Sequence, residues 1–282
     1  MRKRLADPNG EGASITGGRA GAESAGKDTQ FVTALARGLE VLRAFRTDDR
    51  ALGNQQIAER TGLPKPTVSR LTYTLSKLGY LSYLPDSGRY RPGIAVLSLG
   101  FTCLGSIGVR DVARPLMQEL ADHSGVSVAL GTRDRLSMVY VECCRGDSAI
   151  TLALDVGSHI KLGTSSMGRA YIAGLPDHER GLLMEQLERH EGERWPRVRD
   201  GIHEAIEDYR SRGFVVSAGT WKPEVNSVGV PLGIGDGSLS FALNCGGPAY
   251  MLSRERLVED IGPRLAALAA NIRRSMGVGN AA

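Results

Sequence analysis

The 282-residue sequence predicts an α+β protein with two domains. We expect a winged helix-turn-helix first, joined by a linker helix to a domain in which helices cover an antiparallel sheet. Residues 54–91 have the spacing of two crossing helices and a hairpin, and residues 126–272 alternate between strand and helix patterns. The apolar fraction of 41% and the charged fraction of 23% are those of an ordinary globular protein.

The predicted boundaries follow from shifts in composition. Residues 1–29 are rich in Gly, Ala and Ser and have almost no large apolar side chains, so we expect a flexible tail. We assign the winged helix-turn-helix to 30–91, the linker helix to 92–110 and the second domain to 111–276. The N-terminus has no apolar signal-peptide core, and the uncharged run 93–109 is short and glycine-rich. We therefore expect no membrane partner and a cytoplasmic protein.

Three helices are expected in the first domain. The apolar side of the first, over 32–45, is predicted from Leu35, Leu39, Leu42 and Phe45. Asn54 can cap the second helix through its side-chain oxygen. Gly62 suits a tight turn, because glycine adopts a left-handed backbone at little cost. The buried stripe of the third helix is predicted from Val68, Leu71, Leu75 and Leu78.

The outward face of the third helix is polar and cationic, which is typical of a recognition helix in a major groove. Predicted strands at 80–84 and 89–91 form a hairpin around the turn 85–88, and this hairpin would be the wing. Candidate DNA-contacting residues are Asn54, Gln55, Lys65, Pro66, Thr67, Ser69, Arg70, Tyr73, Lys77, Arg89 and Arg91.

The charge distribution favours the same partner. Residues 30–91 hold ten Lys and Arg against five Asp and Glu, whereas residues 111–276 hold nineteen against twenty-two. The positive charge therefore lies on the segment that would meet phosphates, so double-stranded DNA is the predicted partner.

The second domain is expected to mix helices and strands. Strands are predicted at 126–130, 136–143, 150–154, 215–218, 227–232 and 239–244, and helices at 111–124, from 166, at 177–189, at 200–213 and from 253. Asp200 is expected to cap the helix at 200–213.

No pattern predicts an enzyme. The sequence lacks a phosphate-binding glycine loop, and the S-x-x-K match from Ser158 to Lys161 has no companion motifs. Its four cysteines include no C-x-x-C and have no histidine at metal-ligand spacing, so we expect reduced thiols and neither metal nor cofactor.

The loop 162–170 is small and polar and runs into an apolar helix, which leaves free N–H groups at the helix start. Two interpretations stay open from these residues: an ordinary capped helix, or a binding site for an anion.

In the order and spacing of its blocks, the chain resembles the IclR family of bacterial transcriptional regulators over about residues 30–275. The blocks are ALARGLEVLRAF, QQIAERTGLPKPTVSRLTYTLSKLGYL, RYRPGIAVLSLG, GTSSMGRAYIAGLP, SVGVPL and ALNCGGPA. The resemblance implies a GAF-like effector-binding and oligomerisation domain, a homodimer or dimer of dimers, and a near-palindromic operator. It also implies a small organic or aromatic acid as effector.

The resemblance also implies the effector-binding residues. They are Leu152, Ile160, Ser165, Ser166, Met167, Ser217, Ser227, Asn244 and Gly246. Two positions depart from the family: Ser217 stands where larger polar or acidic side chains are frequent, and Glu224 where glycine is common. The expected function is a ligand-responsive regulator of a catabolic operon. The alternatives are a constitutive DNA-binding protein whose second domain only oligomerises, and an enzyme with a regulatory helix-turn-helix.

Overall fold

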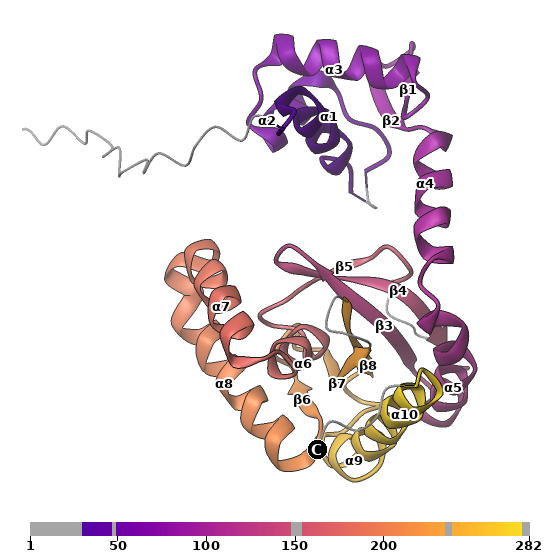
Figure 1. Cartoon of the computed structure of the whole chain (residues 1–282), viewed down its shortest axis with the longest axis vertical. Helices are drawn as coiled ribbons and strands as arrows, with labels where there is room; N and C mark the ends of the chain where they lie inside the picture. The colour runs from indigo at the N-terminus through magenta and orange to yellow at the C-terminus, as the bar shows by residue number, and fades with distance from the viewer. Residues whose placement is uncertain (1–29, 47–48, 148–153, 235–238, 278–282) are drawn as a thin grey trace, which may run out of the picture. The chain divides into compact units, whose positions relative to one another are not determined.

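The computed structural model describes residues 30–46, 49–147, 154–234 and 239–277 (Figure 1). The chain forms two compact units, residues 1–96 and 97–282, and each is described by itself. The predicted tail and all but the last residue of the predicted strand 150–154 lie outside the described residues.

The first unit is three helices and a two-stranded hairpin. The elements are α1 (Thr33–Arg43), α2 (Asn54–Thr61), α3 (Lys65–Lys77), β1 (Leu81–Leu84) and β2 (Arg89–Pro92). Val41, Ile57 and Val68 bring one buried side chain from each helix into a common core. As predicted, Gly62 ends α2 with a left-handed backbone, at a φ of 69°. Leu52 forms an isolated antiparallel bridge with Tyr90 of β2, with which it exchanges two 2.8 Å backbone hydrogen bonds.

Two predicted helix faces in this unit are wrong only in part, because Leu42 and Phe45, and Val68, Leu71 and Leu75 of α3, pack into the core as predicted. Leu35 and Leu39 of α1 are 63% and 52% exposed, and the helix buries Gly38 and Val41 instead. Leu78 is 61% exposed because α3 ends at Lys77. The buried stripe of α3 continues through a polar residue, Thr72, which periodicity alone does not select.

The prediction that Asn54 caps α2 is also wrong. Gly53 holds the N-cap position, and its N–H donates to Oε1 of Gln56 at 3.0 Å. Oδ1 of Asn54 accepts a 3.1 Å hydrogen bond from the Thr72 hydroxyl, so this side chain ties α2 to α3.

The second unit combines a six-stranded sheet with helices on both faces. Its helices are α4 (Ile94–Gly105), which begins just before the boundary of the unit, α5 (Val109–Ser124), α6 (Ser166–Ala173), α7 (Asp177–Glu191), the short 3-10 helix η1 (Gly192–Arg194), α8 (Trp195–Arg212), α9 (Arg254–Arg256), the π-helix η2 (Leu257–Ile261) and α10 (Gly262–Ser275). Its strands are β3 (Ser127–Asp134), β4 (Ser137–Arg145), β5 (His159–Lys161), β6 (Val215–Ala218), β7 (Val225–Ile234) and β8 (Leu239–Pro248).

The sheet has the order β5-β4-β3-β8-β7-β6, and every neighbouring pair is antiparallel. One face packs against α5 and α10, with Met117 and Leu265 among the buried side chains. The other face is covered by α6, and α8 packs on α6 in turn (Figure 1). The predicted α+β class with an antiparallel sheet is thus confirmed.

Three details of the second unit differ from the sequence prediction. The expected linker helix ends at Gly105, and α5 begins separately at Val109. Helix α8 begins at Trp195, so Asp200 lies inside the helix and is no cap. Strand β5 was not predicted, because three residues are too few to show an alternating pattern.

Among the described helices, none alone has the length and apolarity needed to cross a membrane. Only α4 and α5 together reach that length, and they are bent by 83° at the break between them.

A close approach of α6 to the sheet predicts opposite effects of two glycine substitutions. A Cβ at Gly229 in β7 would lie 2.4 Å from the carbonyl oxygen of Ser166, whereas nothing lies within 4 Å of one at Gly181 in α7. We expect Gly229→Ala to lose about 1–3 kcal/mol through overpacking. Gly181→Ala should gain about 0.5–1 kcal/mol, because alanine favours a helix. Calorimetric melting of the full chain measures both, and an unchanged melting temperature for Gly229→Ala would contradict the packing.

Candidate DNA-binding surface and ligand cavity

Side-chain contacts hold the three helices of the first unit together. The bond between Thr72 and Asn54 joins α3 to α2. Arg60 of α2 donates to the carbonyl oxygen of Ala44 at 2.8 Å and forms an ion pair with Asp49. The hydrogen bond from Arg60 lowers the pKa of Asp49. These contacts hold the end of α1 and the segment after it against α2, and they leave the outer face of α3 free.

Nearly all predicted DNA-contacting side chains are exposed in the structure. The exposed ones are Gln55, Lys65, Pro66, Ser69, Arg70, Tyr73, Lys77, Arg89 and Arg91, and the half-buried ones are Asn54 and Thr67. On α3, Lys77 Nζ lies 5.4 Å from the centre of the Tyr73 ring, and on α2, Gln55 donates to Glu59 at 2.8 Å. Asn54 is committed to Thr72 and so has a structural role within the fold.

The hairpin places cations on one side of its second strand. Arg89 and Arg91 are two residues apart in β2 and so point to the same face. Stacking of Tyr83 on Tyr90, with ring centres 5.1 Å apart, stiffens the hairpin behind them. Within the described part of the chain, neither arginine is held in an ion pair, and the same is true of Lys65 and Arg70. A surface of free cations is what phosphate binding requires.

The start of α6 is a capped helix that also leaves N–H donors free, so it has features of both the capped helix and the anion site considered from the sequence. Ser165 is an ordinary N-cap, since its Oγ accepts from the Gly168 N–H at 3.1 Å and its hydroxyl donates to the Lys161 carbonyl at 2.7 Å. The N–H groups of Ser166 and Met167 have no partner among the described residues. These two donors stay available at the positive end of the helix dipole.

A small cavity of about 20 Å³ lies at this helix start. It is lined by Tyr140, Leu154, Ile160, Ser165, Ser166, Trp221, Val225, Ser227, Asn244 and Gly246. Such a volume holds about one water molecule. No charged side chain belongs to its lining.

Two polar atoms of this lining are buried without a hydrogen-bond partner, Ser166 Oγ and Asn244 Oδ1. Nδ2 of Asn244 donates to the Tyr140 hydroxyl at 3.3 Å. Burial raises the pKa of Tyr140, so the phenol stays neutral and keeps its own proton to donate. Because buried polar atoms are normally paired, their convergence here indicates a binding site for a polar group.

The structure brings six of the nine predicted effector residues to the cavity: Ile160, Ser165, Ser166, Ser227, Asn244 and Gly246. Three others do not line it. The buried Met167 side chain lies against Gly131 of β3, the Ser217 hydroxyl bonds to Thr220, and Leu152 lies outside the described residues.

Sequence reasoning missed four residues of the lining: Tyr140, Leu154, Trp221 and Val225. Alternation along the predicted strand 136–143 could have placed Tyr140 on an inner face. Nothing in the sequence indicated Trp221, which lies on the loop between β6 and β7. That loop is braced by Asn226, whose carboxamide accepts from Gly219 N–H at 3.0 Å and donates to the Leu252 carbonyl at 2.8 Å.

Within the described residues, no group of three or more His, Cys, Asp or Glu side chains could hold a metal ion. The four cysteines are all free thiols.

Two family models together match most of the chain. Residues 34–85 match the IclR helix-turn-helix domain, and residues 101–274 match the bacterial transcriptional regulator IclR C-terminal domain. The HTH-type transcriptional regulator TsaQ1/TsaQ2 of Comamonas testosteroni is 36% identical over 250 residues, which cover 88% of this chain and 90% of that protein.

Solved structures have the same fold. An IclR family transcriptional regulator from Brucella abortus is 48% identical with a TM-score of 0.83, over 91% of this chain and 96% of that one. An IclR homolog from Microbacterium hydrocarbonoxydans, in complex with 4-hydroxybenzoate, has a TM-score of 0.68 over 87% of this chain and 100% of that one. At 21% identity this second likeness concerns the fold alone. Together with the family matches, these findings establish that the chain belongs to the IclR family of bacterial transcriptional regulators.

Proposed function

We propose that this chain is a ligand-responsive, cytoplasmic regulator that binds operator DNA. Its affinity for the operator would fall or rise when a small organic acid binds its second unit. The observation that carries the proposal is the pair of unpartnered buried atoms, Ser166 Oγ and Asn244 Oδ1, beside two free N–H groups. Unpaired buried polar atoms cost stability, and the polar group of a ligand would pair them. No catalytic role is proposed.

For DNA binding, we infer that α3 enters the major groove with its N-terminal half leading. Lys65 and Arg70 would meet guanine edges or phosphates, and Ser69 and Tyr73 would add contacts beside them. Arg89 and Arg91 of the wing would bind the flanking phosphates or the adjacent minor groove. In a dimer, two copies of α3 would read half-sites about 34 Å apart, so the operator would be near-palindromic.

For the effector, we infer that a carboxylate accepts hydrogen bonds from the Ser166 and Met167 N–H groups and from the Tyr140 hydroxyl. Leu154, Ile160, Trp221 and Val225 would surround an apolar or aromatic body. The complex of the Microbacterium homolog with 4-hydroxybenzoate supports this class of ligand. Control of a catabolic operon follows from such a ligand and is part of the proposal.

We further propose that the protein is a dimer, with pairing of dimers left open. Helix α4 has no buried residue, and its Leu97 and Phe101 are 52% and 65% exposed one turn apart. On α1, the exposed Leu35 and Leu39 are one turn apart and form a second apolar stripe, and the exposed Phe31 lies just before the helix. Stripes of this kind on soluble helices are normally covered by a partner, here a second copy of this chain.

Arg70→Ala is expected to weaken binding to the duplex upstream of the protein's own gene by about 10- to 100-fold, as loss of a base contact costs about 1–3 kcal/mol. Arg91→Ala should instead weaken binding to native and scrambled duplexes alike and lower the salt slope by about 1, since it removes a phosphate contact. Fluorescence anisotropy over a salt series measures both effects. Arg189→Ala, on the exposed face of α7, is the charge-matched control. Wild-type affinity of Arg70→Ala on the native duplex would overturn the role of α3.

Ser166→Ala is expected to weaken acid binding by about tenfold while leaving the melting temperature equal or slightly higher, because it removes a buried hydroxyl with no partner. Calorimetric titration with small aromatic and aliphatic acids, beginning with 4-hydroxybenzoate, measures the affinity. Ser217→Ala is the matched control, since the Ser217 hydroxyl is bound to Thr220 and does not line the cavity. If no acid of the panel binds or changes operator affinity, the constitutive alternative replaces this proposal.

Phe101→Glu is expected to shift the protein from dimer to monomer, because a charge would enter the apolar interface proposed for α4. Sedimentation velocity over a concentration series measures the change. Cys103→Ser, on another side of the same exposed helix, should leave the sedimentation coefficient as in the wild type. A Phe101→Glu protein that sediments as a dimer at micromolar concentration would exclude α4 from the interface.

A further inference from the structure

A second feature of α6 is separate from the cavity: the side chain of Arg169 is only 7% exposed, yet it is not paired. Its Nε donates to the Gly163 carbonyl at 3.1 Å. Its two terminal nitrogens have no hydrogen-bond or ion-pair partner among the described residues. Arginines buried to this degree are normally paired with a carboxylate or carbonyl groups. The terminal nitrogens of Arg169 reach the solvent instead, so they are open to a further partner.

Helix α8 holds the guanidinium in place by close contact. A Cβ at Gly201 would lie 2.1 Å from Nη2 of Arg169, so no larger residue fits there without moving the side chain. Burial lowers the pKa of Arg169, which means that the charged form is poorly solvated where it lies. An anion bound to the terminal nitrogens would compensate for that lost solvation.

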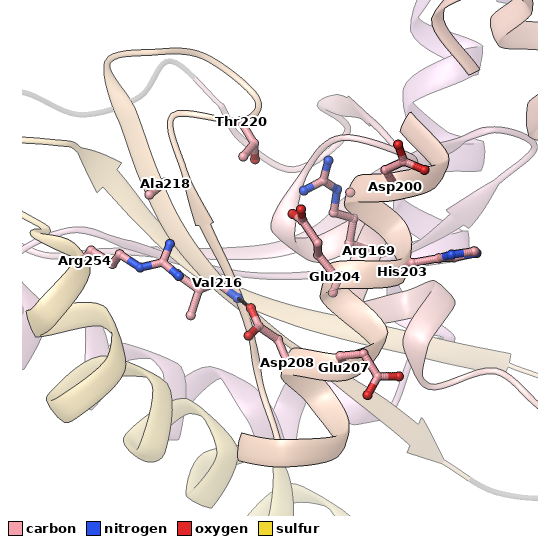
Figure 2. Close-up of a pocket in the computed structure, with 12 residues that line it drawn as sticks. Arg169, Asp200, His203, Glu204, Glu207, Asp208, Val216, Ala218, Thr220 and Arg254 are labelled. Atoms are coloured by element: carbon pink, nitrogen blue, oxygen red, sulfur yellow. Dashed lines mark hydrogen bonds between the residues drawn. The ribbon is translucent and has the colours of Figure 1, made fainter. Parts of the chain in front are cut away.

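The guanidinium ends at a hollow of about 580 Å³ between α8 and β6, which is large enough for a small metabolite (Figure 2). The exposed Glu204 of α8 and Arg169 of α6 extend toward the same space (Figure 2). Burial lowers the pKa of Arg169, and the charge of Glu204 only partly offsets this lowering, because the two side chains form no direct ion pair. Asp200 of α8 and Thr220 of the loop after β6 also line the hollow. The hollow thus presents opposite charges a short distance apart.

We propose that this hollow binds a small zwitterion, an amino acid, with its carboxylate on the terminal nitrogens of Arg169 and its ammonium group on Glu204. A ligand with both charges fits better than a simple acid, because Glu204 and Asp200 would repel an unaccompanied anion. It also fits better than a simple amine, because an amine would leave the terminal nitrogens of Arg169 without an anionic partner. The cavity at the start of α6 has no charged side chain in its lining, so the two sites take different classes of ligand.

Calorimetric titration of the full-length protein with a panel of α-amino acids tests the proposal, with acetate and methylammonium as ligands that each carry one of the two charges. At least one amino acid should bind, and acetate and methylammonium should each bind at least about tenfold more weakly, since each lacks one charge-assisted contact. Glu204→Gln and Arg169→Lys should each weaken amino-acid binding by about tenfold or more.

Glu204→Gln is the more decisive variant, because Glu204 is exposed and its substitution leaves the packing around Arg169 intact. Glu188→Gln, at an exposed carboxylate on α7 that does not line the hollow, is the matched control and should bind as the wild type does. The proposal is overturned if no amino acid of the panel binds at millimolar concentration. It is equally overturned if acetate binds as tightly as the amino acids, or if Glu204→Gln retains wild-type affinity.

Discussion

The close packing of α6 between the sheet and α8 is the constraint on which the rest of the second unit depends. All eight residues of α6 are buried, and the absence of a side chain at Gly229 lets the helix backbone touch the sheet. Two groups depend on this position: the free N–H groups at the helix start, which face the cavity, and the Arg169 guanidinium within the first turn. A helix even slightly farther from the sheet would present neither, because hydrogen-bond donors act over only about 3 Å.

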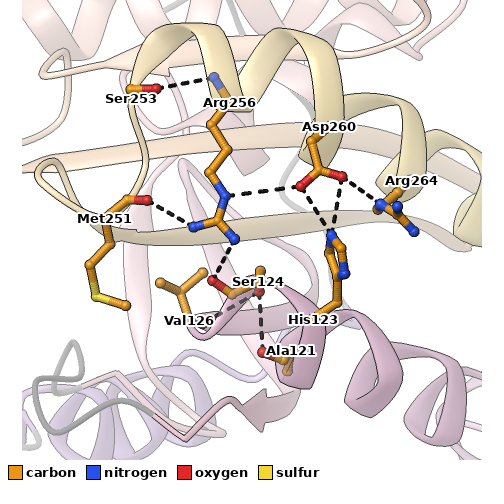
Figure 3. Close-up of polar contacts among 9 residues, drawn as sticks. All are labelled: Ala121, His123, Ser124, Val126, Met251, Ser253, Arg256, Asp260 and Arg264. Atoms are coloured by element: carbon orange, nitrogen blue, oxygen red, sulfur yellow. Dashed lines mark hydrogen bonds and ion pairs between the residues drawn. The ribbon is translucent and has the colours of Figure 1, made fainter.

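Strand β4 connects the cavity to α4 through hydrogen bonds. A β-bulge at Val141 turns Glu142 toward α5, although Tyr140 two residues earlier lines the cavity. Glu142 accepts from Arg110 at 2.8 Å, and the same arginine donates to the Leu104 carbonyl of α4 at 3.0 Å. The far end of α5 is fixed in turn by His123 and Ser124, which bond to Asp260 and Arg256 (Figure 3). These bonds connect β4 to α5 and, through Arg110, to the end of α4.

The sequence predicted what depends on local chemistry and missed what depends on which elements become neighbours. Helix positions and the Gly62 turn follow from spacing and backbone preference, and the structure contains them. The sequence predicts Leu35 and Leu39 on the core side of the first helix together with Leu42, but only Leu42 packs there. An apolar stripe has the same pattern whether it meets the same chain or another copy. Trp221 and Val225 reach the cavity only through the strand order of the sheet, which no periodic pattern encodes. Arg169 belongs to a predicted helix, but its lack of a partner is a property of packing alone.

The small size of the cavity is itself an argument for a switch. A space of about 20 Å³ cannot hold an aromatic acid, so a ligand must displace part of the wall. Among the described residues of the apolar wall, Trp221 and Leu154 are partly buried, whereas Ile160 and Val225 are buried. A ligand changes an equilibrium only through its different affinity for two states, and a wall that must open creates two such states. If the cavity were already large enough, an acid could bind without moving Trp221. Binding would then not favour one conformation of the wall over another.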